Sequence, residues 1–163
     1  MENTVTLIKP HHFLDFLYDF AVGDRHEHEE NVYGSNNAAL CRAFMDGEMK
    51  YIRFTPFVDD ICAPCRKLAE HKRCTDYFDD ATTLYYGFRY KNDFNYQLDL
   101  KLNRALPEVF DFDRTFAMAE LLPLLKANLT EEIIGYYLWN RENRNRNTFL
   151  GIEKAMLIYG NER

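Results

Sequence analysis

The most constraining feature of the sequence is an apolar, aromatic-rich segment at residues 11–22, "HHFLDFLYDFAV". Its apolar side chains recur at the three- and four-residue spacing of an α-helix: Phe13, Leu14, Phe16, Leu17, Phe20 and Ala21. Pro10 suits the first turn of such a helix, and Gly23 suits its end. A helix with so wide an apolar face must dock against other parts of the chain.

Most of the remaining chain also shows helical spacing. The other expected helices cover 36–46, 94–106, 114–126, 130–138 and 148–159. Thr130 and Thr148 are the expected N-caps of the last two helices, and Pro123 is an expected break or kink. Only 49–54, "MKYIRF", is typical of a strand. The sequence therefore predicts an all-α or nearly all-α protein: one helical domain over 1–163, with one short strand and a cysteine-bearing metal loop.

Length and charge exclude several classes of protein. A chain of 163 residues fits one domain that can bury a real core. Its net charge of −6 gives no general attraction to nucleic acid or to anionic membranes. No apolar run approaches the roughly 18–20 residues of a membrane span, and no targeting segment is visible. We therefore expect a cytoplasmic protein, whose thiols stay reduced.

Three cysteines lie close together in "VDDICAPCRKLAEHKRC", residues 58–74. Cys62 and Cys65 form a Cys-x2-Cys pair, and Cys74 follows eight residues after Cys65. A tight turn between the first two can direct both sulfurs at one centre, and the third can return to it. Three sulfur ligands suit Zn²⁺ or an iron–sulfur cluster rather than Mg²⁺ or Ca²⁺. The flanking charged residues argue against three thiols buried in an apolar core.

A fourth ligand is expected, because both zinc and cubane clusters usually take four. On a helix His11 and His12 lie four and three residues before Asp15, so these three side chains can form one polar cluster. The other candidates are Cys41, on an expected helix, and His71, within the cysteine segment. The sequence alone does not decide among these five candidate ligands.

Two further polar patterns are interpreted as solvated loops. One is "RHEHEE" (25–30), in which His26 and His28 stand among acids. The other is the arginine-rich "RENRNRN" (141–147) between two expected helices. No glycine-rich phosphate loop, nucleophile elbow or His-Glu-x-x-His motif is present.

The combination of "KPHHFLD" with the later "DDICAPC" and a further cysteine resembles a known family. It is similar to the domain-of-unknown-function 1284 family of small bacterial and archaeal proteins, in which iron–sulfur binding is suspected. That family typically opens with Arg-x-His-His-Leu-Leu-Cys and continues with Asp-Asp-Ile-Cys and later cysteines. The resemblance covers residues 7–74, whereas 75–163 carry no recognised motif.

The resemblance implies roles for particular residues. His11 and His12 match the paired histidines, and the matches to the acidic and cysteine positions are Asp59, Asp60, Ile61, Cys62, Cys65 and Cys74. Asp15 stands where the family has its first cysteine. The resemblance thus implies a cluster with one carboxylate or imidazole ligand, which holds iron less strongly than a thiolate.

The leading hypothesis is an iron–sulfur protein, with a 4Fe–4S cluster held by Cys62, Cys65, Cys74 and either Asp15 or His12. Its role would be redox chemistry or chemistry at a labile iron, with a redox partner or small-molecule substrate and no nucleic acid or membrane. One alternative is a structural zinc domain that serves as an interaction module. Another is a metal-independent enzyme in which Asp15 orients His12 for acid–base chemistry.

Overall fold

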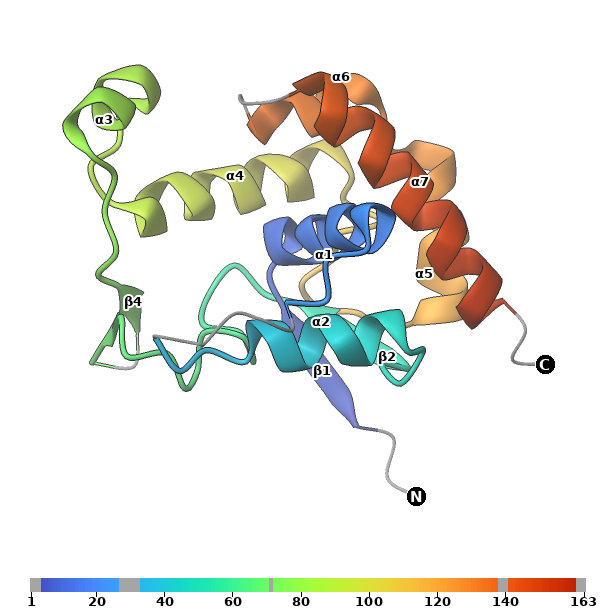
Figure 1. The fold of residues 1–163 in the computed structure, drawn as a ribbon. Helices are drawn as coiled ribbons and strands as arrows, with labels where there is room; N and C mark the ends of the chain where they lie inside the picture. The colour runs from blue at the N-terminus through green and yellow to red at the C-terminus, as the bar shows by residue number, and fades with distance from the viewer. Residues whose placement is uncertain (1–3, 27–32, 71, 138–140, 161–163) are drawn as a thin grey trace.

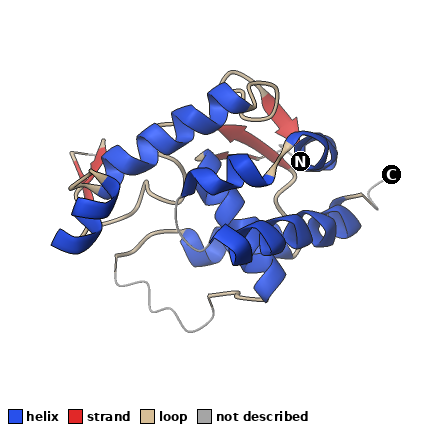
Figure 2. Cartoon of the chain, turned by 90° about the horizontal axis from the view of Figure 1, so that it is seen from above, coloured by secondary structure: helices blue, strands red, loops and turns tan. Residues whose placement is uncertain are grey.

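The computed structural model describes residues 4–26, 33–70, 72–137 and 141–160. It shows an α/β fold, so the prediction of a nearly all-α protein is wrong. A three-stranded sheet and a separate two-stranded hairpin accompany the helices (Figures 1 and 2).

The three-stranded sheet joins segments that lie far apart in the sequence. Its strands are β1 (Val5–Ile8), β2 (Tyr51–Phe54) and β5 (Thr115–Ala117). The central strand β2, which was predicted, pairs in parallel with β1 and antiparallel with β5. Strands of three or four residues bury only one or two side chains each, so alternation gives almost no signal for them. This is why β1 and β5 were missed.

The helices largely follow the predicted periodicity. They are α1 (Pro10–Val22), α2 (Asn37–Met45), α3 (Asp80–Tyr86), α4 (Lys91–Ala105), α5 (Met118–Asn128), α6 (Glu131–Ile134) with the 3₁₀ turn η1 (Gly135–Tyr137), and α7 (Arg141–Tyr159). Helix α1 begins at Pro10 and is capped after Val22 by Gly23, whose φ of 76° is left-handed, as expected. The Thr130 hydroxyl accepts a hydrogen bond from the Ile133 N–H, which confirms it as an N-cap.

The start of the last helix was predicted wrongly. Helix α7 includes 141–147, which was expected to be a loop, and Thr148 is a buried residue within the helix rather than its cap. Arg144 anchors this polar first part, because its guanidinium donates to Asp15 on α1 at 2.7 Å. Pro123 lies inside α5 without ending it.

Helix α1 is the centre of the packing (Figure 1). It lies between the sheet and α2 on one side and α4 and α7 on the other. Phe13 and Phe16 of α1 are fully buried, and both rings contact Phe44 of α2. Each such buried ring contributes on the order of 2–3 kcal/mol relative to an exposed one. Among the described residues, no helix is long and apolar enough to cross a membrane.

The cysteine segment is more structured than the expected loop. A turn at residues 60–64 is followed by the short hairpin of β3 (Leu68–Ala69) and β4 (Arg73–Cys74). The hairpin lies at the end of the molecule that also holds α3 (Figure 2). Helix α3 has no buried residue, and it was not predicted.

Helices α1 and α7 touch backbone to backbone at Gly151. A Cβ added there would clash with the Leu17 carbonyl oxygen and lie 2.6 Å from its carbonyl carbon. We expect Gly151→Ala to lower the free energy of unfolding by about 3 kcal/mol or more, since neither backbone can yield. Urea denaturation measures this, with Leu157→Ala on the exposed face of α7 as the control. Equal midpoints for the two variants would contradict the close contact.

Candidate functional site

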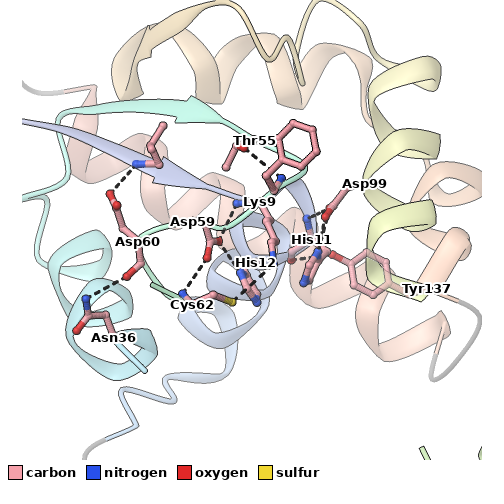
Figure 3. A network of polar contacts seen from close by, with 12 residues as sticks. Lys9, His11, His12, Asn36, Thr55, Asp59, Asp60, Cys62, Asp99 and Tyr137 are labelled. Carbon is pink, nitrogen blue, oxygen red and sulfur yellow. Dashed lines mark hydrogen bonds and ion pairs between the residues drawn. The ribbon is translucent and has the colours of Figure 1, made fainter. Parts of the chain in front are cut away.

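The Asp59 carboxylate ties the cysteine segment to the start of α1 (Figure 3). Its Oδ2 accepts from the Lys9 N–H at 2.9 Å and from His12 Nδ1 at 2.7 Å, and its Oδ1 accepts from the Cys62 N–H at 2.9 Å. Asp59 is 1% exposed. Its neighbour Asp60 accepts from the Leu7 N–H at 2.8 Å. The adjacent acids of "DDIC" therefore connect the turn at residues 60–64 to strand β1 and helix α1.

His12, Asp59 and Cys62 form one group whose ligand atoms all lie within 4.8 Å of one another. The paired-histidine segment therefore packs against the cysteine segment, as predicted, although 47 residues separate His12 from Asp59. The Lys9 ammonium also donates to the Cys62 sulfur at 3.6 Å. An imidazole, a carboxylate and a sulfur gathered in this way are the donors that a borderline or soft metal ion takes.

The charges in this group depend on burial and on near neighbours. Burial raises the pKa of Cys62 to about 12, and the Asp59 charge adds to this rise while Lys9 opposes it. Burial alone would raise the pKa of Asp59 too, but His12 and Lys9 together bring it below its usual range. Asp59 is thus ionised and Cys62 protonated at neutral pH, so a metal that binds Cys62 must displace a proton.

The other two cysteines of the segment flank this group. The Cys65 N–H donates to the Cys62 carbonyl at 2.9 Å, and Cys74 lies in β4 opposite Leu68. Cys74 is near enough to Cys62 to contribute to its raised pKa. Among the described residues, however, the three sulfurs do not form a group within 4.8 Å of one another. All four cysteines of the chain are free thiols.

His11 has its own carboxylate partner. Its backbone N–H and its ring Nδ1 both lie 2.9 Å from oxygens of Asp99, which is 0% exposed. The Tyr137 hydroxyl donates to the His11 carbonyl at 2.8 Å. Burial lowers the pKa of His11, but the charge and hydrogen bond of Asp99 outweigh it and raise the pKa overall. The His11 Nε2 is buried, with no hydrogen-bond partner among the described residues.

Adjacent histidines of one helix are therefore held by two different buried carboxylates. The ring centroids of His11 and His12 lie 4.2 Å apart at 51°. In each ring Nδ1 forms a hydrogen bond with the carboxylate, and Nε2 lies on the edge turned away from it (Figure 3). This arrangement is typical both of metal-ligating histidines and of acid–base histidines. Sequence reasoning missed Asp99 and the role of Asp59, although an acid between Leu98 and Leu102 on an apolar stripe was a usable signal.

Asp15 lies apart from the group of His12, Asp59 and Cys62. Its Oδ1 accepts from Arg144 Nη1 at 2.7 Å, and the Arg144 guanidinium lies over the Tyr137 ring at 4.0 Å. Asp15 belongs to neither group of metal-ligand type among the described residues. The carboxylate that orients His12 is Asp59, not Asp15 as the acid–base hypothesis expected.

Cys41 lies in a second group, with Asp19 and His26. His26 Nε2 is 3.0 Å from Asp19 Oδ2, so His26 is part of a packed cluster rather than a solvated loop. Cys41 is 0% exposed, and burial raises its pKa to about 12. The remaining candidates, His71 and His28, lie outside the described residues.

The chain matches no protein-family model, no curated protein and no solved structure. The family resemblance of the paired histidines and the cysteine segment therefore stays a prediction.

The second group should make stability depend on pH. Burial, opposed by the His26 hydrogen bond, raises the pKa of Asp19 to about 6. A carboxyl with a raised folded pKa takes up a proton on folding, so stability falls as pH rises from about 4 through 6. The side chain introduced by Asp19→Asn stays neutral at every pH. We therefore expect the free energy of unfolding of this variant, relative to that of wild type, to rise by roughly 1–2 kcal/mol from pH 4 to pH 7.

Urea denaturation at both pH values measures this gain. The control is Asp113→Asn at an exposed loop position, which should show none. A difference between Asp19→Asn and wild type that does not change with pH would contradict the raised pKa.

Proposed function

We propose that the protein holds an iron–sulfur cluster between the cysteine segment and the first turn of α1. Cys62, Cys65 and Cys74 supply thiolates, and His12 supplies the fourth ligand. The observation that supports a metal centre here most directly is the group of His12, Asp59 and Cys62 within 4.8 Å. It brings a sulfur of the Cys-x2-Cys pair to a histidine whose orientation is already fixed.

The spacing of the sulfurs favours a cluster over a single ion. A tetrahedral zinc ion needs all its ligands at about 2.0–2.3 Å, so their donor atoms must lie close together. The three sulfurs are more widely spaced than this among the described residues. A cluster binds each thiolate at a different iron, which accommodates wider spacing, and when bound it supplies one-electron chemistry or an iron with an open position.

His12 is a better fourth ligand than Asp15. A metal-binding histidine usually donates a hydrogen bond from its other ring N–H to a carboxylate, which fixes the tautomer and the ring orientation. Asp59 accepts that hydrogen bond from Nδ1 and leaves Nε2 as the ligand atom. Asp15 is already engaged by Arg144. We further propose a cytoplasmic location, in keeping with four free thiols, and a redox partner or small-molecule substrate.

A second candidate is an acid–base enzyme that needs no metal. It is favoured by the His11–Asp99 and His12–Asp59 pairs, in which a buried carboxylate orients each imidazole as in hydrolase triads. The third candidate is a structural interaction module in which the same residues bind zinc instead of an iron–sulfur cluster.

Replacement of single cysteines by alanine tests the proposal. We expect anaerobically prepared wild type to contain iron and acid-labile sulfide and to absorb visible light. Each of Cys62→Ala, Cys65→Ala and Cys74→Ala should lose most of this signal, because a cubane rarely persists with a missing thiolate. Cys41→Ala is the matched control and should keep it. A colourless wild-type protein with one equivalent of zinc would support the structural zinc site. A colourless wild-type protein without metal would support the acid–base enzyme.

The identity of the fourth ligand is tested by the rate of iron loss in air. With His12 as ligand, His12→Ala should lose iron several-fold faster than wild type, since water is a poorer ligand than imidazole. Asp15→Ala should match wild type, and Asp15→Cys should bring no protection. Faster loss in Asp15→Ala together with slower loss in Asp15→Cys would assign the position to Asp15 instead.

A further inference from the structure

A cavity of about 450 Å³ lies beside the paired histidines, within the size range of small-molecule sites. Helices α1, α3, α4 and α7 and the turn η1 contribute to its wall, together with the segment just before α3. His12 both lines the cavity and belongs to the group of His12, Asp59 and Cys62. The Cys62 side chain is not part of the wall, so the cavity is a neighbour of the proposed metal centre and not the centre itself.

One side of the cavity is aromatic. Phe78, Tyr86 and Phe94 are in mutual contact, with ring centroids 4.9 to 5.8 Å apart. Leu98 and Tyr137 extend this apolar surface. The rings come from the segment before α3, from α3 and from α4, so together they form a wall against which a flat ring can stack.

The cavity wall also carries a guanidinium with unused donors. Arg144 is 12% exposed at its side chain, and its guanidinium lies 4.0 Å from the centre of the Tyr137 ring. Its Nη1 donates to Asp15, and its other N–H groups have no partner among the described residues. An arginine held by an aromatic face and one carboxylate is oriented to bind a second carboxylate through its free donors.

His11 supplies a buried polar atom that lacks a partner. Its Nδ1 edge faces Asp99, which does not line the cavity, whereas His11 itself does. The opposite edge carries Nε2, which is buried and unpaired among the described residues. His11 thus contributes its ring to the cavity wall, while its Nε2 lies beneath the cavity surface with no accessible area.

The charge of the wall limits the charge of the ligand. Its cations are Lys91 and Arg144, and its anions are Asp15 and Asp79. Lys91 also pairs with Asp76 at 2.7 Å. These four charges sum to zero, so a phosphate with two negative charges would be compensated less well than a single carboxylate, which Arg144 can bind through its remaining donors.

We propose that this cavity binds a small aromatic carboxylate. The ring stacks on Phe78, Tyr86 and Phe94, and the carboxylate accepts from Arg144. The site does not depend on a bound metal, although a ligand there would lie beside His12.

Calorimetric titration with 4-hydroxybenzoate tests the proposal. We expect saturable binding by wild type, at least tenfold weaker binding of the neutral 4-hydroxybenzamide, and similar weakening in Arg144→Gln, because a charge-assisted hydrogen bond is lost. Arg89→Gln, which removes an exposed arginine paired with Asp80, is the matched control and should bind as wild type does. No binding by wild type at about 10 mM, or equal binding of acid and amide, would overturn the proposal.

A second variant guards against a folding defect in Arg144→Gln. Thr82 lines the cavity from α3, which has no buried residue, so Thr82→Trp should fill the space and abolish binding while far-UV circular dichroism stays unchanged. Undiminished binding in folded Thr82→Trp would place the ligand elsewhere and overturn the proposal. Titration of Cys62→Ala separates the cavity from the metal centre: retained binding supports the cavity whatever the fate of the cluster, and lost binding overturns it.

Discussion

The arrangement of the site depends on the hydrogen bonds that the ionised Asp59 carboxylate accepts. It accepts hydrogen bonds from three positions in two parts of the chain, and without it the Lys9 N–H, the Cys62 N–H and His12 Nδ1 would lose their common acceptor. Burial of an unpaired carboxylate would be costly, so the position of Asp59 and the positions of its donors determine one another. The start of helix α1 and the turn that bears Cys62 are thereby fixed together, which places a histidine and a sulfur side by side.

The first turn of α1 is held from two directions. Consecutive residues of a helix point about 100° apart, so His11 and His12 cannot share one partner, and each reaches a different buried acid. Asp99 on α4 holds one ring, and Asp59 in the cysteine segment holds the other. Rotation of α1 about its axis would break both pairs at once. The orientation of both imidazoles is therefore set before any ligand arrives, as preorganised sites require.

The sequence predicted well what is local and poorly what is long-range. The bounds of α1 followed from Pro10, its apolar spacing and Gly23, because these act within a few residues. Strand β5 depends on pairing with β2 across about sixty residues, and no local pattern carries that information. The same limit applied to the site: proximity of the histidines to the cysteines was correctly predicted, but their carboxylate partners were not. The polar start of α7 was taken for a loop, because the contact from Arg144 to Asp15 that anchors it spans 129 residues.

Helix α3 differs from the other walls of the cavity in how it is attached. None of its side chains is buried, and the contacts of Tyr86 with Phe78 and Phe94 hold it at the end of α4. Elements with so little buried apolar surface exchange their amide hydrogens through local opening, at a free energy far below that of global unfolding. Helix α3 is therefore the least stable wall of the cavity, while His11 and the apolar face of α1 are buried in the core. Local opening of α3 would separate Tyr86 from Phe78 and Phe94 and leave the Asp59 connection intact.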